Sequence, residues 1–251
     1  GMPYWLIPDA MVEAEPGVVK LRAASDVAHL DVTWRLGPDD AEPVVTWELH
    51  ARQDGSFSLG ALYGPEVALD DVNFVLLPFR FQNKRVPEES YLVLEAYTPT
   101  PVSMMTVADA GMPDGEVTFG IVVDPVEIPY RWARPENSRF GLAIRGMDGG
   151  VQPALFAPVM GTEEARLRAG DRFSFTYRPV ARSGGWAGAF RHVVTDIYRV
   201  TDYRRNYYAS LTDTIFNIQE LMLDDWYGGW DKVAKAHYNM EGRNVVSLAS
   251  P

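Results

Sequence analysis

The sequence predicts a mainly β protein, with a large antiparallel β-sandwich over residues 1–181 and a helical region over residues 182–251. Short apolar or alternating runs recur along residues 16–180, and clusters of Gly, Pro, Asp and Asn separate them. No helix-patterned segment lies between these runs, which argues against βαβ units and a parallel sheet. After the Arg-Ser-Gly-Gly stretch at 182–185, the apolar period changes from two residues to three or four.

The expected strands are rich in Val, Thr, Phe, Tyr and Trp, which suit a pleated and half-buried surface. In chain order they are VVKLRAA, HLDVTWRL, VVTWELHAR, FVLLPFRF, YLVLEAYT, VTFGIVVD, FGLAIRG and FSFTYRP. In the third run, Val45, Trp47 and Leu49 share one face, and the polar residues between them share the other. About ten to fourteen strands of this kind predict a large sandwich.

The residues after the break have helical spacing. A first helix is predicted from one apolar face, made of Phe190, Val193, Val194, Ile197 and Val200. Such a face must be buried against another element, so we expect this helix to cover the sandwich.

A second helix is predicted to begin at Ser210, where Ser210 and Asp213 have the spacing of a capping box. Its apolar residues, which we also expect to cover the sandwich, are Leu211, Ile215, Ile218, Leu221 and Met222. A third, short helix is expected near Asp231, after a pair of glycines.

Composition argues against several partners. The net charge of −11 argues against nucleic acid and against anionic membrane surfaces, because both attract clustered Lys and Arg. No apolar run approaches the roughly 20 residues of a membrane span. The chain has no cysteine, which excludes disulfides, thiol nucleophiles and cysteine-type zinc sites. If Met2 is the native start, no signal peptide is present and a cytoplasmic location is expected; a trimmed leader would fit a secreted or periplasmic protein.

No catalytic or cofactor signature is present, since GxSxG, P-loop and GxGxxG patterns are all missing. The histidines His29, His50, His192 and His237 are scattered, without HxH or HExxH spacing. They are therefore expected to be ordinary surface or core residues, and neither a metal nor a cofactor is expected.

Two pairs of neighbouring aspartates, Asp70-Asp71 and Asp224-Asp225, could in principle serve glycoside hydrolysis. That reaction needs two carboxyl groups roughly 5–10 Å apart. Adjacent aspartates usually point apart on a strand or lie exposed, so we assign no catalytic residue.

The candidate ligand-binding residues are Arg80, Gln82, Lys84 and Trp132. The first three are expected on one side of an extended strand, where they could form hydrogen bonds with sugar hydroxyls or with a carboxylate. Trp132 could stack on a sugar ring. The alternatives are a solvated sheet face for the polar residues and core packing for the tryptophan.

The order of sandwich, linker helices and further helical sequence resembles carbohydrate-active enzymes of the six-hairpin glycosidase type. The residues that carry the resemblance are FRHVVTDIYRVTDYRRN at 190–206, followed by SLTDTIFNIQEL and NVVSLASP. In those enzymes an N-terminal supersandwich, of the galactose-mutarotase-like kind, is joined by helices to an (α/α)6 barrel. The resemblance implies that residues 182–251 are the linker and the start of a helical region, with a barrel domain in the parent protein as partner. No catalytic residue carries over.

The resemblance implies the N-terminal β-sandwich region of a glycoside-hydrolase-like protein, accessory to carbohydrate processing and non-catalytic by itself. Its ligand or substrate would be a carbohydrate. Two alternatives stay open: a free-standing carbohydrate-binding or interaction module, and a complete mutarotase-like enzyme.

Overall fold

The computed structural model describes residues 10–200, except residues 79, 90, 99, 129, 130 and 147, together with residues 210–223, 230–231, 236–238 and 246–247. The chain divides into two compact units, Gly1–Val200 and Thr201–Pro251. The predicted mainly β fold with antiparallel sheets is confirmed. The predicted domain boundary between residues 181 and 182 falls near the end of a strand, and it stays a prediction.

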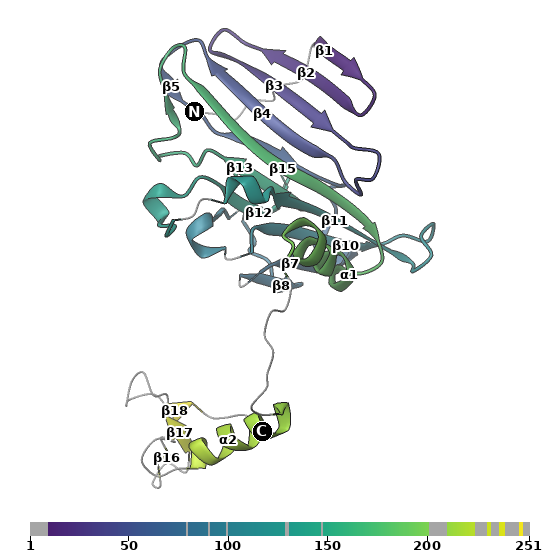
Figure 1. Cartoon of the computed structure of the whole chain (residues 1–251), viewed down its shortest axis with the longest axis vertical. Helices are drawn as coiled ribbons and strands as arrows, with labels where there is room; N and C mark the ends of the chain where they lie inside the picture. Colours follow the sequence, from purple (N-terminus) through teal and green to yellow (C-terminus); the bar gives the residue numbers. More distant parts are fainter. Residues whose placement is uncertain are drawn as a thin grey trace. The chain divides into compact units, whose positions relative to one another are not determined.

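The first unit is built on a nine-stranded antiparallel sheet, whose long strands run side by side in Figure 1. Its strand order is β1-β2-β3-β4-β15-β11-β10-β7-β8. In that order the strands are β1 Ala10–Glu15, β2 Val18–Ala24, β3 Ala28–Arg35, β4 Val44–Ala51, β15 Arg172–Ser183, β11 Glu116–Val123, β10 Val102–Ala108, β7 Val72–Leu77 and β8 Phe81–Asn83.

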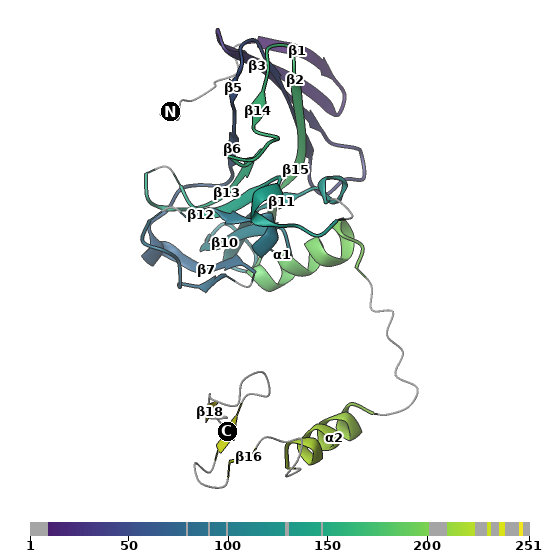
Figure 2. The same cartoon turned by 90° about the vertical axis from the view of Figure 1, so that its left-hand side faces the viewer.

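A four-stranded antiparallel sheet packs against strands β7, β10 and β11 of the large sheet, and a strand pair lies beside it (Figure 2). The order of the four strands is β6 Leu59–Leu62, β13 Val151–Ala157, β12 Gly141–Arg145 and β9 Val93–Leu94, and the pair is β14 Arg166–Leu167 with β5 Gly55–Ser56. Single 3-10 turns complete the unit: η1 Leu69–Asp71, η2 Glu95–Tyr97, η3 Pro125–Glu127 and η4 Pro135–Asn137.

The main core lies between the two sheets. Trp47 and Leu49 of β4 and Phe175 of β15 pack there with Phe140 and Leu155. The predicted alternation in β4 is confirmed: Val45, Trp47 and Leu49 are buried, whereas Thr46, Glu48 and His50 are half-buried. Burying an apolar side chain of this size contributes about 1.5–3 kcal/mol, so this face fixes the register of the strand.

The opposite face of strands β10 and β11 is covered by helix α1, Trp186–His192, which continues as one π-helical turn, η5 Val193–Ile197 (Figure 1). Val193 and Ile197 are buried against Met104 and Val122 of the sheet. The predicted apolar helix face is therefore confirmed over most of its length, although Val200 lies beyond the helix and is 57% exposed.

A buried histidine anchors this helix to the sheet unit. His192 Nε2 lies 2.7 Å from a carboxylate oxygen of Glu42, in the loop between β3 and β4, and His192 Nδ1 lies 2.7 Å from Asp196. Glu42 and His192 are both buried. Buried polar groups of this kind need their hydrogen bonds, so the contact fixes how α1 lies on the first unit.

The second unit contains helix α2, Leu211–Leu223, and the short antiparallel strands β16 Trp230–Asp231, β17 Ala236–Tyr238 and β18 Val246–Ser247. The predicted capping box is confirmed: the Asp213 backbone N–H donates to Ser210 Oγ at 3.0 Å, and the Ser210 N–H donates to the Asp213 carboxylate at 3.1 Å. The expected helix near Asp231 is wrong, because a strand of the small sheet occupies that position.

Within the second unit, five apolar side chains of α2 are exposed: Leu211, Ile215, Phe216, Ile218 and Leu221. The expectation that they cover the sandwich depends on the relative placement of the two units and stays a prediction.

One predicted strand, FVLLPFRF, is instead a hairpin. Strand β7 ends at Leu77, the Arg80 N–H donates to the Leu77 carbonyl at 3.0 Å, and β8 pairs back antiparallel. Pro78 follows Leu77 and has no N–H for a strand ladder, which explains why pairing stops there.

Candidate functional site

A surface pocket of about 360 Å³ lies where helix α1 begins beside strands β7, β10 and β11. Each of these elements belongs to the first unit, so the pocket is formed within one packed body. The lining residues are Asn73, Phe74, Thr106, Glu116, Gly185, Trp186, Ala187 and Gly188.

Two aromatic side chains form the apolar part of the pocket. The rings of Phe74 and Trp186 stack with centroids 4.7 Å apart and planes 11° apart. Phe74 comes from β7, and Trp186 is the first residue of α1. Both rings are partly exposed, so the stack presents apolar surface to the pocket.

The polar side chains that line the pocket are those of Asn73, Thr106 and Glu116. Asn73 Nδ2 donates a hydrogen bond of 2.7 Å to Glu116 Oε1. A Cβ atom at Gly185 would lie only 3.0 Å from Glu116 Oε2, so a glycine lets the chain pass close to that oxygen. The second oxygen of Glu116 thus lies beside the start of α1.

The pocket unites an aromatic surface, an amide and a carboxylate in one depression. Such a set can bind a polar ring molecule that has an apolar face, because stacking and hydrogen bonding act on it together. Sequence reasoning did not single out Phe74 or Trp186 for a site, because more than one hundred residues separate them and only the packing of α1 on the sheet brings them together.

The residues predicted to bind a ligand lie elsewhere on the first unit: Arg80, Gln82 and Lys84 in and beside the edge strand β8, and Trp132 in the loop between η3 and η4. The Arg80 guanidinium lies over the ring of Tyr97, 5.1 Å from its centroid. Gln82 is exposed in β8, and Lys84 Nζ donates to the Asp70 carbonyl at 3.2 Å. Trp132 is 84% exposed.

Strand β8 spans only Phe81–Asn83, so Arg80 and Lys84 lie in turns on either side of it. The predicted shared strand face for Arg80, Gln82 and Lys84 therefore exists only in part. Their predicted role in ligand binding stays a prediction.

The structure does not place the described pair of aspartates, Asp70 and Asp71, in a pocket. Asp70 and Asp71 are both exposed in the 3-10 turn η1, and Asp224 and Asp225 lie outside the described residues. Residues 201–209 of the predicted linker also lie outside the described residues.

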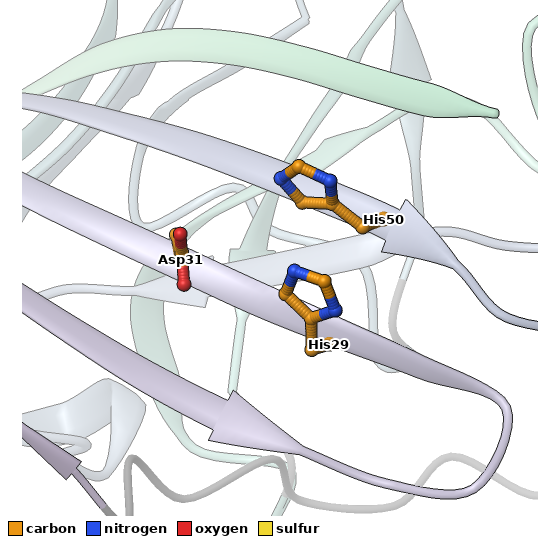
Figure 3. Close-up of side chains that lie close together, drawn as sticks. All are labelled: His29, Asp31 and His50. Carbon is orange, nitrogen blue, oxygen red and sulfur yellow. The ribbon is translucent and has the colours of Figure 1, made fainter. Parts of the chain in front are cut away.

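A second cluster lies on the outer face of strands β3 and β4, where His29, Asp31 and His50 come together (Figure 3). The strand register places His29 directly opposite His50, and their rings stack with centroids 4.2 Å apart and planes 13° apart. The histidines have no metal-site spacing in the sequence, yet the strand register brings this pair together; their expected role as ordinary residues stays a prediction. The sequence contained a sign of this cluster. The alternation of apolar and polar residues places His29, Asp31 and His50 on the polar faces of two successive strands.

Charged neighbours surround this cluster. Arg22 Nη2 donates to Asp31 Oδ2 at 2.7 Å, Arg22 Nε donates to Oδ1, and Lys20 Nζ lies 3.2 Å from Oδ2. The hydrogen bonds from Arg22 hold the pKa of Asp31 well below its ordinary value, at about 2. Burial and the neighbouring His50 lower the pKa of His29.

The fold and the pocket together define this chain as a two-sheet antiparallel β protein with a helix-covered face and an aromatic, polar surface pocket. No protein-family model matches the chain, and no curated protein matches it. Among solved structures, the chain is similar to a variant of the GH36 alpha-galactosidase AgaA from Geobacillus stearothermophilus, which was crystallised in complex with raffinose. The two are 15% identical with a TM-score of 0.46, and the match covers 92% of this chain and 36% of that one.

The chain thus spans about a third of the length of that enzyme. In the part of the chain that the structure describes, no helix is both long and apolar enough to cross a membrane.

Proposed function

We propose that this chain is a β-sandwich region of a glycoside-hydrolase-like protein, which binds a glycan but does not cleave it. The observation that carries the proposal is the Phe74–Trp186 stack in a pocket that also holds the Asn73–Glu116 pair. Its role in carbohydrate processing would be accessory, holding the sugar chain near a catalytic region.

The chemistry of sugars supports this choice of ligand. A pyranose has an apolar C–H face that packs on an aromatic ring, and its rim of hydroxyl groups needs donors and acceptors. The indole supplies the apolar surface, Glu116 accepts hydrogen bonds, and Asn73 both donates and accepts. The pocket volume of about 360 Å³ also lies at the small end of the range for small-molecule sites.

Binding without cleavage is supported by the carboxylates of the pocket. Glycoside hydrolysis uses two carboxyl groups placed across the scissile bond. Glu116 is the single carboxylate among the described residues that line the pocket, and its Oε1 accepts from Asn73. A glycan could therefore be held here, whereas the second acid of a hydrolase has no counterpart in this lining.

We also propose that α2 belongs to the start of a helical region that continues in the parent protein. Within the second unit, apolar side chains of α2 are exposed, and such side chains are suited to packing against further helices. The reading frame of the parent gene tests it: we expect a long helical continuation after Pro251, and a stop codon directly after that residue would contradict it.

Glycan binding is tested by isothermal titration calorimetry with a panel that includes glucose, galactose, raffinose and β-linked oligosaccharides. We expect at least one ligand to bind, and Trp186→Ala to weaken it by about tenfold or more, which corresponds to about 1.4 kcal/mol. Because Trp186 also packs on Phe74, Glu116→Gln is a second variant that keeps the shape of the pocket.

The matched control is Trp132→Ala, which removes an indole that is 84% exposed elsewhere on the same unit. Equal affinity in wild type, Trp186→Ala and Glu116→Gln would overturn the proposed pocket. Loss of binding in Trp132→Ala alone would place the site at Trp132 instead, one of the residues predicted from the sequence.

A further inference from the structure

We propose that His29, Asp31 and His50 form a binding site for one divalent transition-metal ion, of the Zn²⁺ or Ni²⁺ type, on the outer face of β3 and β4. The proposal is independent of the glycan pocket, which is formed by other strands. It rests on the strand register, on the distances among the possible ligand atoms, and on the hydrogen bonds that hold Asp31.

The register brings the three ligands together. His29 and His50 are paired residues of adjacent antiparallel strands, and Asp31 lies two residues beyond His29 on the same face. One possible ligand atom from each side chain can be chosen so that all lie within 4.8 Å of one another. Figure 3 shows the two rings side by side with the Asp31 carboxylate next to them.

The separations among the possible ligand atoms, which reach up to 4.8 Å, are somewhat longer than those around a bound ion. Zinc bonds to nitrogen and oxygen are about 2.0–2.2 Å long, which places ligand atoms around one ion roughly 3–4 Å apart. The stacked rings would turn about their Cβ–Cγ bonds so that one nitrogen of each faces the ion. Both histidines are only partly buried.

The ring of His29 has an unused polar atom. Its Nδ1 is buried and has no hydrogen-bond partner within the described part of the chain. A buried nitrogen without a partner is unfavourable, and no hydrogen bond to it holds the ring in its stacked orientation. Reorientation of the ring toward a ligand therefore breaks no hydrogen bond at Nδ1.

Asp31 is held as a metal-binding carboxylate is usually held, by hydrogen bonds from outside the ligand set. Arg22 and Lys20 together occupy Oδ2, whereas Oδ1 accepts from Arg22 Nε alone. Each carboxylate oxygen has two lone pairs, so Oδ1 keeps one for a single metal bond. The ion would thus have two imidazole ligands and one carboxylate ligand, with water completing its coordination.

The choice of metal follows from the ligands. Imidazole suits Zn²⁺, Cu²⁺ and Ni²⁺, whereas Mg²⁺ and Ca²⁺ prefer sites made of oxygen atoms alone. The positive charges of Arg22 and Lys20 oppose the charge of any cation, so nitrogen ligation has to supply most of the affinity. We therefore expect Zn²⁺ and Ni²⁺ to bind and Mg²⁺ not to bind.

The test uses the tag-free chain, stripped with EDTA and titrated with ZnCl₂, NiCl₂ and MgCl₂ by calorimetry. We expect one Zn²⁺ or Ni²⁺ per chain and at least tenfold weaker binding in His29→Ala and in His50→Ala. His237→Ala is the matched control, since residue 237 belongs to a strand of the other unit, and it should bind as wild type does.

A second readout works on the wild-type protein and does not depend on how the variants fold. Imidazole signals in ¹H–¹⁵N spectra are followed during Zn²⁺ titration, and those of His29 and His50 should shift together at one equivalent. The proposal is overturned if Zn²⁺ and Ni²⁺ do not bind, if binding survives both alanine substitutions, or if the imidazole signals that shift belong to His192 or His237.

Discussion

Phe74 of strand β7 and Trp186 of helix α1 stack with their ring planes 11° apart, and this contact forms one wall of the surface pocket. The same helix is packed on the sheet through Val193 and Ile197 and is anchored through His192. The pocket therefore exists only while α1 is docked. Stability of the helix and integrity of the proposed glycan site should change together.

Removing a buried side chain from the helix should destabilise the first unit. Ile197 is 7% exposed and packs among Val122, Met104 and Val193. We expect Ile197→Ala to lower the free energy of unfolding by about 2–5 kcal/mol, measured by denaturant titration. Val200→Ala is the control, because Val200 is 57% exposed, and it should change that free energy by about 0.5 kcal/mol or less. Equal effects would contradict the docking of α1.

The buried contact between Glu42 and His192 should contribute more to stability than the exposed contact between Asp196 and His192. Glu42→Ala leaves His192 Nε2 without its hydrogen-bond partner in a buried site, and we expect it to lower the free energy of unfolding by about 1–3 kcal/mol. Asp196→Ala removes the other partner of the same ring, whose side chain is 63% exposed, and should cost about 1 kcal/mol or less. A larger cost for Asp196→Ala in thermal or chemical unfolding would show that the helix is held differently.

Acid should remove the stabilisation that Asp31 supplies. Its pKa of about 2 in the folded protein lies below the ordinary value, so the folded state favours the carboxylate and gains stability above about pH 4. That gain is lost as the pH falls from about 4 to about 2. In metal-free buffer, we expect Asp31→Asn to be less stable than wild type by about 2 kcal/mol at pH 6, and by roughly half of that at pH 3.

Glu48→Gln serves as the control for this pH dependence, because Glu48 also approaches Lys20, at 3.7 Å, but its side chain is 45% exposed. Its difference from wild type should stay small at both pH values. A difference for Asp31→Asn that does not shrink between pH 6 and pH 3 would be incompatible with a depressed pKa.

The chain by itself should not hydrolyse glycosides. Asp70 and Asp71 are exposed in a 3-10 turn, and Glu116 is hydrogen-bonded to Asn73. We expect no turnover of nitrophenyl glycosides above the background rate. Turnover that disappears in Asp70→Asn, Asp71→Asn or Glu116→Gln would contradict a non-catalytic role.

The recurrence of short apolar runs was enough to predict antiparallel sheets, and in β4 the alternation also predicted which face is buried. Trp47 and Leu49 are buried as predicted, because burial on one face fixes the side-chain period of a strand. The buried helix face at Val193 and Ile197 could be predicted from the helical spacing of its apolar residues. These features depend on local periodicity, which a single sequence contains.

The candidate sites depend on which segments lie beside each other, and that is set by topology. The Phe74–Trp186 stack requires α1 to cover strands that precede it by many residues, which no local pattern states. The His29–His50 pair requires the register of two neighbouring strands, which was inferable only once their pairing was assumed. The residues chosen from the sequence, such as Trp132, have suitable chemistry but lie outside the pocket.

Glycan binding beside α1 is measured most directly by titrating the chain with the tightest-binding oligosaccharide while following tryptophan indole signals in ¹H–¹⁵N spectra. The chain has 7 tryptophans, whose signals can be assigned with single Trp→Phe variants. We expect the Trp186 indole to shift in proportion to the bound fraction, while the buried Trp47 indole stays in place. A shift of the Trp132 indole with an unchanged Trp186 signal would contradict the proposed pocket.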